Sequence, residues 1–237
     1  MIFPHIDAIT MNTLKFVTGN PNKVIEVNAI LGGLIPVEPV SLDLPEIQGS
    51  LEEIAIDKCR RAAKIINGPV IVEDSALEFH AMNRLPGPYM NVSHASWLCK
   101  SKYFLESLGN DGLNRLLYSH TDKSADAVCT FAFSAGPEME PLVFQGRLEG
   151  KIVPARGPPV FGWEPIFEHK GETLAEMAHD KKNKLSHRYQ ALFRFQEWLA
   201  RDNNRLMIGH DWMGSITLFV APQFAWNRAG TIAIFRE

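Results

Sequence analysis

The sequence has few cysteines, no large excess of either charge and no long hydrophobic run. Its three cysteines, Cys59, Cys99 and Cys129, include no CxxC pair, which argues against a disulfide framework or a zinc site and favours the cytoplasm. A net charge of −3 over 237 residues disfavours an extended nucleic-acid-binding surface. The first ten residues carry no Lys or Arg, unlike a signal peptide. The apolar stretch 216–226 is about half of the ~20 residues that a membrane span needs. We therefore expect neither a nucleic-acid nor a membrane partner.

A hydrophobic content of 46% is enough for one large core, and the patterning predicts its class. Strands are expected over 14–17, 69–72, 127–134 and 142–148, the last two paired through a turn at Gly136-Pro137. Helices are expected over 23–31, 51–66, 104–118 and 185–200, and Ser50 with Glu53 has the spacing of a capping box. Helices that alternate with strands and then give way to a hairpin predict an α/β fold with a mixed sheet.

Polar motifs follow the first strand. Thr18-Gly19-Asn20, with Lys23 one turn later, stands where a strand meets a helix. Backbone amides at a helix N-terminus favour anions, and the lysine could meet a phosphate. The Walker A spacing is absent, and ordinary turn chemistry explains Gly-Asn equally well.

Carboxylates are concentrated in two further segments. Glu46-Ile47-Gln48-Gly49 precedes a helix, and Glu73-Asp74-Ser75 directly follows the apolar run 69–72. Acids at the carboxyl end of a buried strand lie where α/β sheets present ligands, and they could hold Mg²⁺ or take a proton from water. The alternatives are a solvated acid at the first segment and a strand-ending turn with capping acids at the second.

An aromatic segment and a basic segment complete the pattern. Phe161-Gly162-Trp163-Glu164 lies in a glycine- and aromatic-rich stretch that could stack on a flat base or simply pack in the core. The segment 181–188 brings several cations to a helix start, where the helix dipole prefers anions. A bound phosphate or base carbonyl would resolve that mismatch, and a solvated basic loop is the alternative.

Taken in order, these segments resemble the inosine triphosphate pyrophosphatase family over about residues 13–200. The match also includes Leu85-Pro86-Gly87-Pro88-Tyr89, Ala175-Glu176-Met177 and Lys182-Asn183 with Ser186-His187-Arg188. The resemblance implies an elongated, two-lobed single domain with a central nucleotide cleft. It also implies a cytoplasmic homodimer that hydrolyses deaminated purine nucleoside triphosphates (ITP, dITP and XTP) to the monophosphate and pyrophosphate.

The resemblance also implies residue roles. Glu46 and Asp74 would hold Mg²⁺, with Mn²⁺ as a substitute, and Asp74 would also act as the general base. Glu73 would support this acidic centre, and Lys23 would act in catalysis. The triphosphate would be bound by Thr18, Gly19, Asn20, Lys23 and Lys58, and Lys102 would also bind the substrate. The nucleoside would be bound by Ser75, Phe161, Gly162, Trp163, Glu164, Lys182, His187 and Arg188. Donors at His187 and Arg188 suit a 6-keto acceptor, whereas an adenine would leave each unpaired at a cost of ~1–3 kcal/mol.

The chain departs from the family pattern in three places. Residues 91–101 resemble an insertion beside the nucleotide site, Glu164 stands where the family commonly has aspartate, and 202–237 extends past the family's usual end. We therefore expect a pyrophosphatase domain over 12–201. One alternative is a related enzyme for other modified or pyrimidine nucleotides. The other is a nucleotide-binding or dimer-forming protein whose activity the insertion has abolished or altered.

Overall fold

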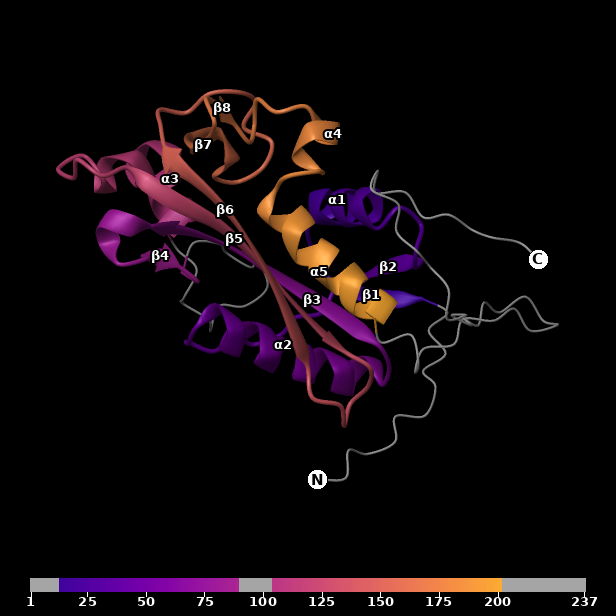
Figure 1. The fold of residues 1–237 in the computed structure, drawn as a ribbon. Helices are drawn as coiled ribbons and strands as arrows, with labels where there is room; N and C mark the ends of the chain where they lie inside the picture. The colour runs from indigo at the N-terminus through magenta and orange to yellow at the C-terminus, as the bar shows by residue number, and fades with distance from the viewer. Residues whose placement is uncertain (1–12, 90–103, 202–237) are drawn as a thin grey trace. The chain divides into compact units, whose positions relative to one another are not determined.

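The computed structural model describes the chain apart from residues 1–12, 90–103 and 202–237 (Figure 1). Lys102, the insertion 91–101 and the extension 202–237 therefore lie outside the described residues. The account below concerns the compact unit Thr13–Phe195. No helix in the described part of the chain is long and apolar enough to cross a membrane.

The core of this unit is one mixed sheet, as the patterning predicts, but it contains eight strands where four were expected. Seven strands follow one another in the order β2-β1-β3-β5-β6-β7-β8, and β4 pairs with β3 off this path. The β2–β1 and β1–β3 pairs are parallel, and all other pairs are antiparallel. The strands are β1 (Leu14–Val17), β2 (Val37–Val40), β3 (Val70–Phe79), β4 (Pro86–Gly87), β5 (Ser124–Ser134), β6 (Leu142–Ile152), β7 (Phe167–His169) and β8 (Glu172–Thr173).

Helices cover both faces of the sheet (Figure 1). Helix α2 (Leu51–Ile66) packs on β3 and β5, burying Ala55, Cys59 and Ala62 against Val72. The opposite face carries α1 (Pro21–Leu31) and α5 (His187–Arg201), with Phe195 of α5 against Phe133 and Phe144. A second core forms around α3 (Phe104–Leu116). The remaining short helices are η1 (His80–Met82), η2 (Glu164–Ile166) and α4 (His179–Lys182).

The capping box predicted for α2 is confirmed. The Ser50 side chain accepts from the backbone N–H of Glu53, and the Glu53 carboxylate accepts from the backbone N–H of Ser50. The apolar side chains of this helix face the sheet: Leu51, Ala55, Cys59 and Ala62 are buried, and Ile66 is partly buried. These contacts fix the helix that carries Lys58.

The prediction that a strand ends at residue 72 was wrong. Strand β3 continues to Phe79 because β5 pairs with it along its whole length, including Glu73↔Phe131 and Asp74↔Thr130. The acids therefore lie within the strand, and the strand-ending turn is excluded. Successive side chains of a strand point to opposite faces, so Glu73 and Asp74 face different layers.

Two helix predictions also need correction. The helix expected over 104–118 ends at Leu116 and is interrupted at Gly109, whose φ of 61° and ψ of −178° are not helical. The helix expected over 185–200 starts at His187, and Lys182 belongs to the separate helix α4. Ser186 precedes α5 and accepts from the backbone N–H of Tyr189 through its Oγ, the geometry of an N-terminal cap.

Candidate active site

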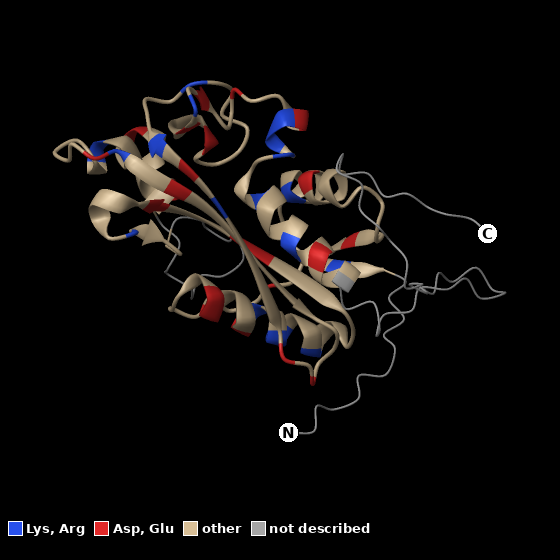
Figure 2. Cartoon of the chain, in the orientation of Figure 1, with Lys and Arg blue, Asp and Glu red and all other residues tan. Residues whose placement is uncertain are grey.

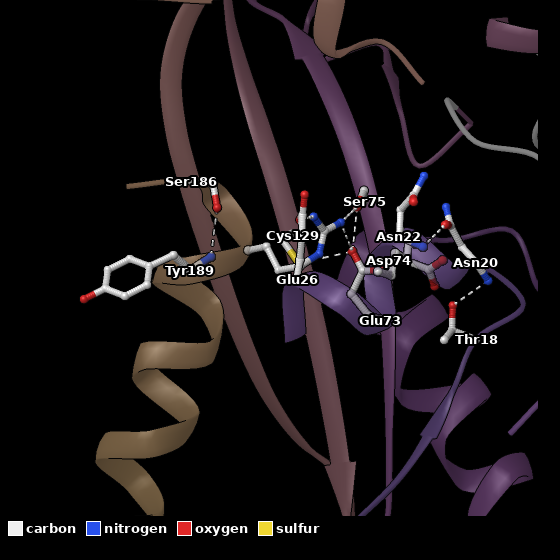
Figure 3. A network of polar contacts seen from close by, with 12 residues as sticks. Thr18, Asn20, Asn22, Glu26, Glu73, Asp74, Ser75, Cys129, Ser186 and Tyr189 are labelled. Atoms are coloured by element: carbon white, nitrogen blue, oxygen red, sulfur yellow. Dashed lines mark hydrogen bonds and ion pairs between the residues drawn. The ribbon is translucent and has the colours of Figure 1, made fainter. Parts of the chain in front are cut away.

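The loop between β1 and α1 is shaped by its own side chains. Thr18 Oγ1 accepts from the backbone N–H of Asn20 at 3.1 Å, and Asn20 Oδ1 accepts from the backbone N–H of Asn22 at 3.0 Å (Figure 3). Asn20 thereby caps α1, which starts at Pro21 rather than at residue 23 as predicted. This loop places Lys23 in the first turn of the helix.

The loop lies beside an unpaired edge of β3. β1 pairs with β3 only up to Val17↔Val72, and β4 begins to pair with it at Leu77↔Gly87. In the described residues, segment 73–76 has a β partner on its β5 side alone. Because β1 ends here, a ligand at this edge of β3 can contact side chains on both faces of the strand. Ligands of α/β sheets bind at such strand ends.

On the α2 face of this edge, three predicted site residues come together. Lys58 Nζ lies 3.2 Å from Glu46 Oε1 and 3.1 and 3.2 Å from the two carboxylate oxygens of Asp74. Burial alone would lower the pKa of Lys58, but the Asp74 and Glu46 carboxylates outweigh it and raise that pKa above its usual value. The ammonium therefore stays charged between the two acids.

On the opposite face, Glu73 joins two cations. Its Oε2 forms an ion pair with Lys23, and its Oε1 accepts from Arg188 Nη2 at 3.2 Å and Ser75 Oγ at 2.5 Å. Cys129 also donates to Oε1 at 3.2 Å (Figure 3). Burial opposes ionisation of Glu73, yet Lys23 and Arg188 hold its pKa well below the usual value. Glu73 is thus held in one orientation, and its ionised form is favoured by the two cations.

Two cations of the basic segment, Lys182 and Arg188, are buried and paired with acids, whereas Lys181 and Lys184 are exposed. Lys182 Nζ lies 2.6 Å from Glu26 and 2.9 Å from Glu164, and Arg188 forms a second ion pair with Glu26. The solvated-loop alternative therefore fails for Lys182, His187 and Arg188, which are at most 5% exposed.

Glu26 is the residue whose role the sequence reasoning missed. It was assigned no function, although it stands three residues after Lys23 on the same helix. Residues three positions apart lie on the same face of a helix, so this spacing indicates that Glu26 and Lys23 belong to one charged cluster.

The aromatic segment lies against this basic cluster. The Phe161 ring centroid is 5.3 Å from both Lys182 Nζ and Arg188 Cζ, and the Trp163 and His187 rings are 5.5 Å apart. Trp163 also contacts Phe167 and is buried in the core around α3. Core packing is therefore confirmed for Trp163, whereas Phe161 lies against the cations and its stacking on a base stays a prediction.

Two titratable groups here are strongly perturbed. Burial raises the pKa of Glu164 to about 7, with Lys182 opposing and Glu26 adding to the shift. Burial and the Arg188 charge hold the pKa of His187 well below its usual value. Among the buried side-chain atoms described, His187 Nδ1 and Arg188 Nε have no hydrogen-bond partner. A neutral imidazole and a free guanidinium N–H beside aromatic rings are groups that a polar ligand would satisfy.

The predicted site residues in the described ranges thus come together at one end of β1, and Lys102 alone cannot be placed. Figure 2 marks the positions of the acidic and basic residues along the strands and helices of this unit. Within the described residues, no three His, Cys, Asp or Glu side chains are arranged to hold a metal. Two carboxylates at the edge suit Mg²⁺, which often binds one or two protein carboxylates and completes its shell with water and substrate phosphate.

An α/β sheet whose strand end carries acids, lysines and an aromatic-cationic cluster has the groups that a ligand with phosphates and an aromatic ring would contact. The comparisons with known proteins agree: a profile described as the Ham1 family matches residues 14–198, so the chain belongs to that family. The chain is 56% identical over 190 residues to the inosine triphosphate pyrophosphatase of Ajellomyces capsulatus, covering 80% of this chain and 98% of the relative. Its identity to the Aspergillus oryzae protein of that name is 59% over 189 residues, covering 79% and 93%. The Coxiella burnetii HAM1 protein structure is similar, with a TM-score of 0.67 at 27% identity, covering 80% of this chain and 98% of that one.

Proposed function

We propose that this chain hydrolyses deaminated purine nucleoside triphosphates, ITP, dITP and XTP, to the monophosphate and pyrophosphate. Relatives more than half identical to it are named inosine triphosphate pyrophosphatases and align over nearly their whole length. The observation that carries the base assignment is the buried Arg188 Nε, a donor without a partner beside the Phe161 ring.

The base would be selected by its 6-keto oxygen. Hypoxanthine and xanthine present an acceptor at this position, which Arg188 Nε can satisfy, and the His187 imidazole is the adjacent group. Adenine presents an amino donor there and would leave the buried N–H unsatisfied, at a cost of ~1–3 kcal/mol. Phe161 would stack on the base, and Lys182 and Glu164 would close the same side.

The triphosphate would lie along the edge of β3 between the two faces. The amides of Thr18, Gly19 and Asn20 and the ammonium of Lys23 would hold phosphate oxygens. Glu46 and Asp74 would bind Mg²⁺, or Mn²⁺ in its place. When bound, the ion would neutralise charge that develops on the phosphate oxygens.

The chemical step uses the carboxylates on the α2 face of the β3 edge. A water oxygen attacks the α-phosphorus, the bond to the bridging oxygen breaks, and pyrophosphate leaves. Asp74 accepts the proton from this water as general base. Glu73, fixed by Arg188, Ser75 and Cys129, holds Lys23 toward the phosphates.

We propose a homodimer in the cytoplasm, acting on the free nucleotide pool, because the family resemblance implies both. The net charge of −3 supports a small-molecule substrate rather than nucleic acid.

The test is pyrophosphate release from ITP, GTP and ATP with Mg²⁺. It compares the intact chain, Asp74→Asn, and a chain lacking residues 91–101. We expect release from ITP in preference to ATP, and a loss of at least about a hundredfold in Asp74→Asn.

Two other outcomes have defined meanings. Activity only after the deletion would show that the insertion blocks a competent site. Folded protein that binds ITP but releases no pyrophosphate in either form would instead support the binding-protein alternative.

A further inference from the structure

The contacts of Lys58 go beyond those of a phosphate-binding lysine. Its Nζ lies within 3.2 Å of three carboxylate oxygens, one from Glu46 and two from Asp74. The side chains are 15%, 6% and 12% exposed for Lys58, Glu46 and Asp74. Water therefore screens this cluster much less than it screens a surface ion pair.

These oxygens are the same ones that the proposed metal site would use. An ammonium ion and a divalent cation are both attracted to carboxylate oxygens, and one of them bound to these oxygens weakens the binding of the other by charge repulsion. The helix that carries Lys58 is held by its capping box, whereas the lysine side chain is a flexible four-carbon stem. The side chain can therefore move while the helix stays in place.

We propose that Lys58 competes with a divalent cation for Glu46 and Asp74, so that metal binding releases its ammonium toward the substrate phosphates. The proposal rests on the proposed function for its assignment of the metal ligands. Metal binding is thereby coupled to the movement of the Lys58 ammonium toward the phosphates.

The competition gives Lys58 two opposite effects. Its removal should tighten metal binding, because the ion no longer displaces an ammonium from the carboxylates. The same change should weaken binding of the triphosphate, because a phosphate contact is lost. A lysine that merely braced the two acids would give the reverse effect on the metal, since its loss would loosen the site.

The experiment measures binding of Mn²⁺ alone by electron paramagnetic resonance, using the full chain. Lys58→Met is compared with the native chain and with Lys64→Met, which removes an exposed lysine from the same helix. We expect Lys58→Met to lower the Mn²⁺ dissociation constant on the order of tenfold, and Lys64→Met to leave it unchanged. Adding Glu46→Gln to Lys58→Met should reverse the gain, which places the ion at these carboxylates.

Unchanged or weaker Mn²⁺ binding in folded Lys58→Met overturns the proposal, as does equal tightening in Lys64→Met. If Lys58→Met does not fold, Lys58→Gln gives the same comparison with a polar side chain. Failure of the proposed function is seen separately, as absence of pyrophosphate release from ITP by the native chain. Tighter Mn²⁺ binding in Lys58→Met supports the competition even then.

Discussion

Glu26 anchors the cations at the proposed base-binding end of the site. It forms ion pairs with both Lys182 and Arg188, and its side chain is only 6% exposed. Burial alone would raise the pKa of Glu26, but Arg188 and Lys182 outweigh it and hold that pKa below its usual value. Removing a buried carboxylate that lies between two buried cations leaves uncompensated positive charge inside the protein.

Replacement of Glu26 by glutamine should therefore cost far more stability than loss of a surface acid. We expect Glu26→Gln to lower the free energy of unfolding by about 3 kcal/mol, because Lys182 and Arg188 each lose one of two buried carboxylate partners. The matched control is Glu38→Gln, which removes an acid that is 55% exposed and paired with Lys15, and should cost less than about 1 kcal/mol. Urea denaturation followed by circular dichroism gives both values, and equal losses would contradict the assignment.

Glu164 makes a pH-dependent contribution of its own. Its pKa is raised from 4.5 to about 7, so the folded protein binds this proton more tightly than the unfolded chain. The stabilisation from Glu164 should be fully present below pH ~4.5 and should disappear as the pH rises through about 7. The pKa of His187 is lowered, so its contribution to stability is present above pH ~6.5 and is lost as the pH falls below that value.

The two contributions can be separated with Glu164→Gln. The difference in unfolding free energy, native chain minus variant, should decline as pH rises between 4.5 and 7, by about 1 kcal/mol per pH unit at most. Thermal or urea denaturation across this range measures it. A difference that is flat with pH would show that Glu164 ionises normally.

At the scale of elements, the close packing of β6 on α5 fixes the position of the site residues at the start of α5. A Cβ on Gly146 would lie 2.1 Å from the carbonyl oxygen of His187 and 2.4 Å from the backbone nitrogen of Ala191. These atoms belong to the helix backbone and cannot turn away as a side chain would. Glycine at 146 thus lets the helix that carries His187 and Arg188 lie directly on the strand.

Gly146→Ala should push α5 from the sheet and lower the free energy of unfolding by about 3 kcal/mol, near the upper end for overpacking. ITP turnover should fall as well, because Arg188 would move relative to Glu73. Gly136→Ala is the control, since a Cβ there meets nothing within 4 Å. Equal stability and turnover in the two variants would refute the close-packing argument.

At the scale of the whole molecule, the family match covers residues 14–198 and the compact unit covers Thr13–Phe195. A chain limited to residues 12–201 should therefore fold and hydrolyse ITP with a kcat/KM within about threefold of the full chain. Steady-state kinetics and melting curves of the two chains would test this. A large loss in the short chain would assign a role to residues 1–11 or 202–237.

The sequence predicted most of the elements, because their signals are local. Ser50 and Glu53 define the start of α2, Gly136-Pro137 marks the hairpin, and the apolar period of α2 follows the buried face. The errors came where tertiary pairing decides the outcome. Strand β3 passes through Glu73-Asp74-Ser75 because β5 pairs with those residues, although charged residues normally end an apolar run.

The sequence by itself determined the family, the α/β class and the identity of nearly every candidate site residue, because ordered motifs retain residue type and spacing. Only the tertiary structure decided how those residues divide between the two faces of β3. Asp74 meets Lys58 and Glu46 on one face, while Glu73 meets Lys23 and Arg188 on the other. Charge partners such as Glu26 and Arg188 are 162 positions apart in the chain, and no local pattern links positions so distant. Their contact depends on the packing of α1 and α5 on the same face of the sheet.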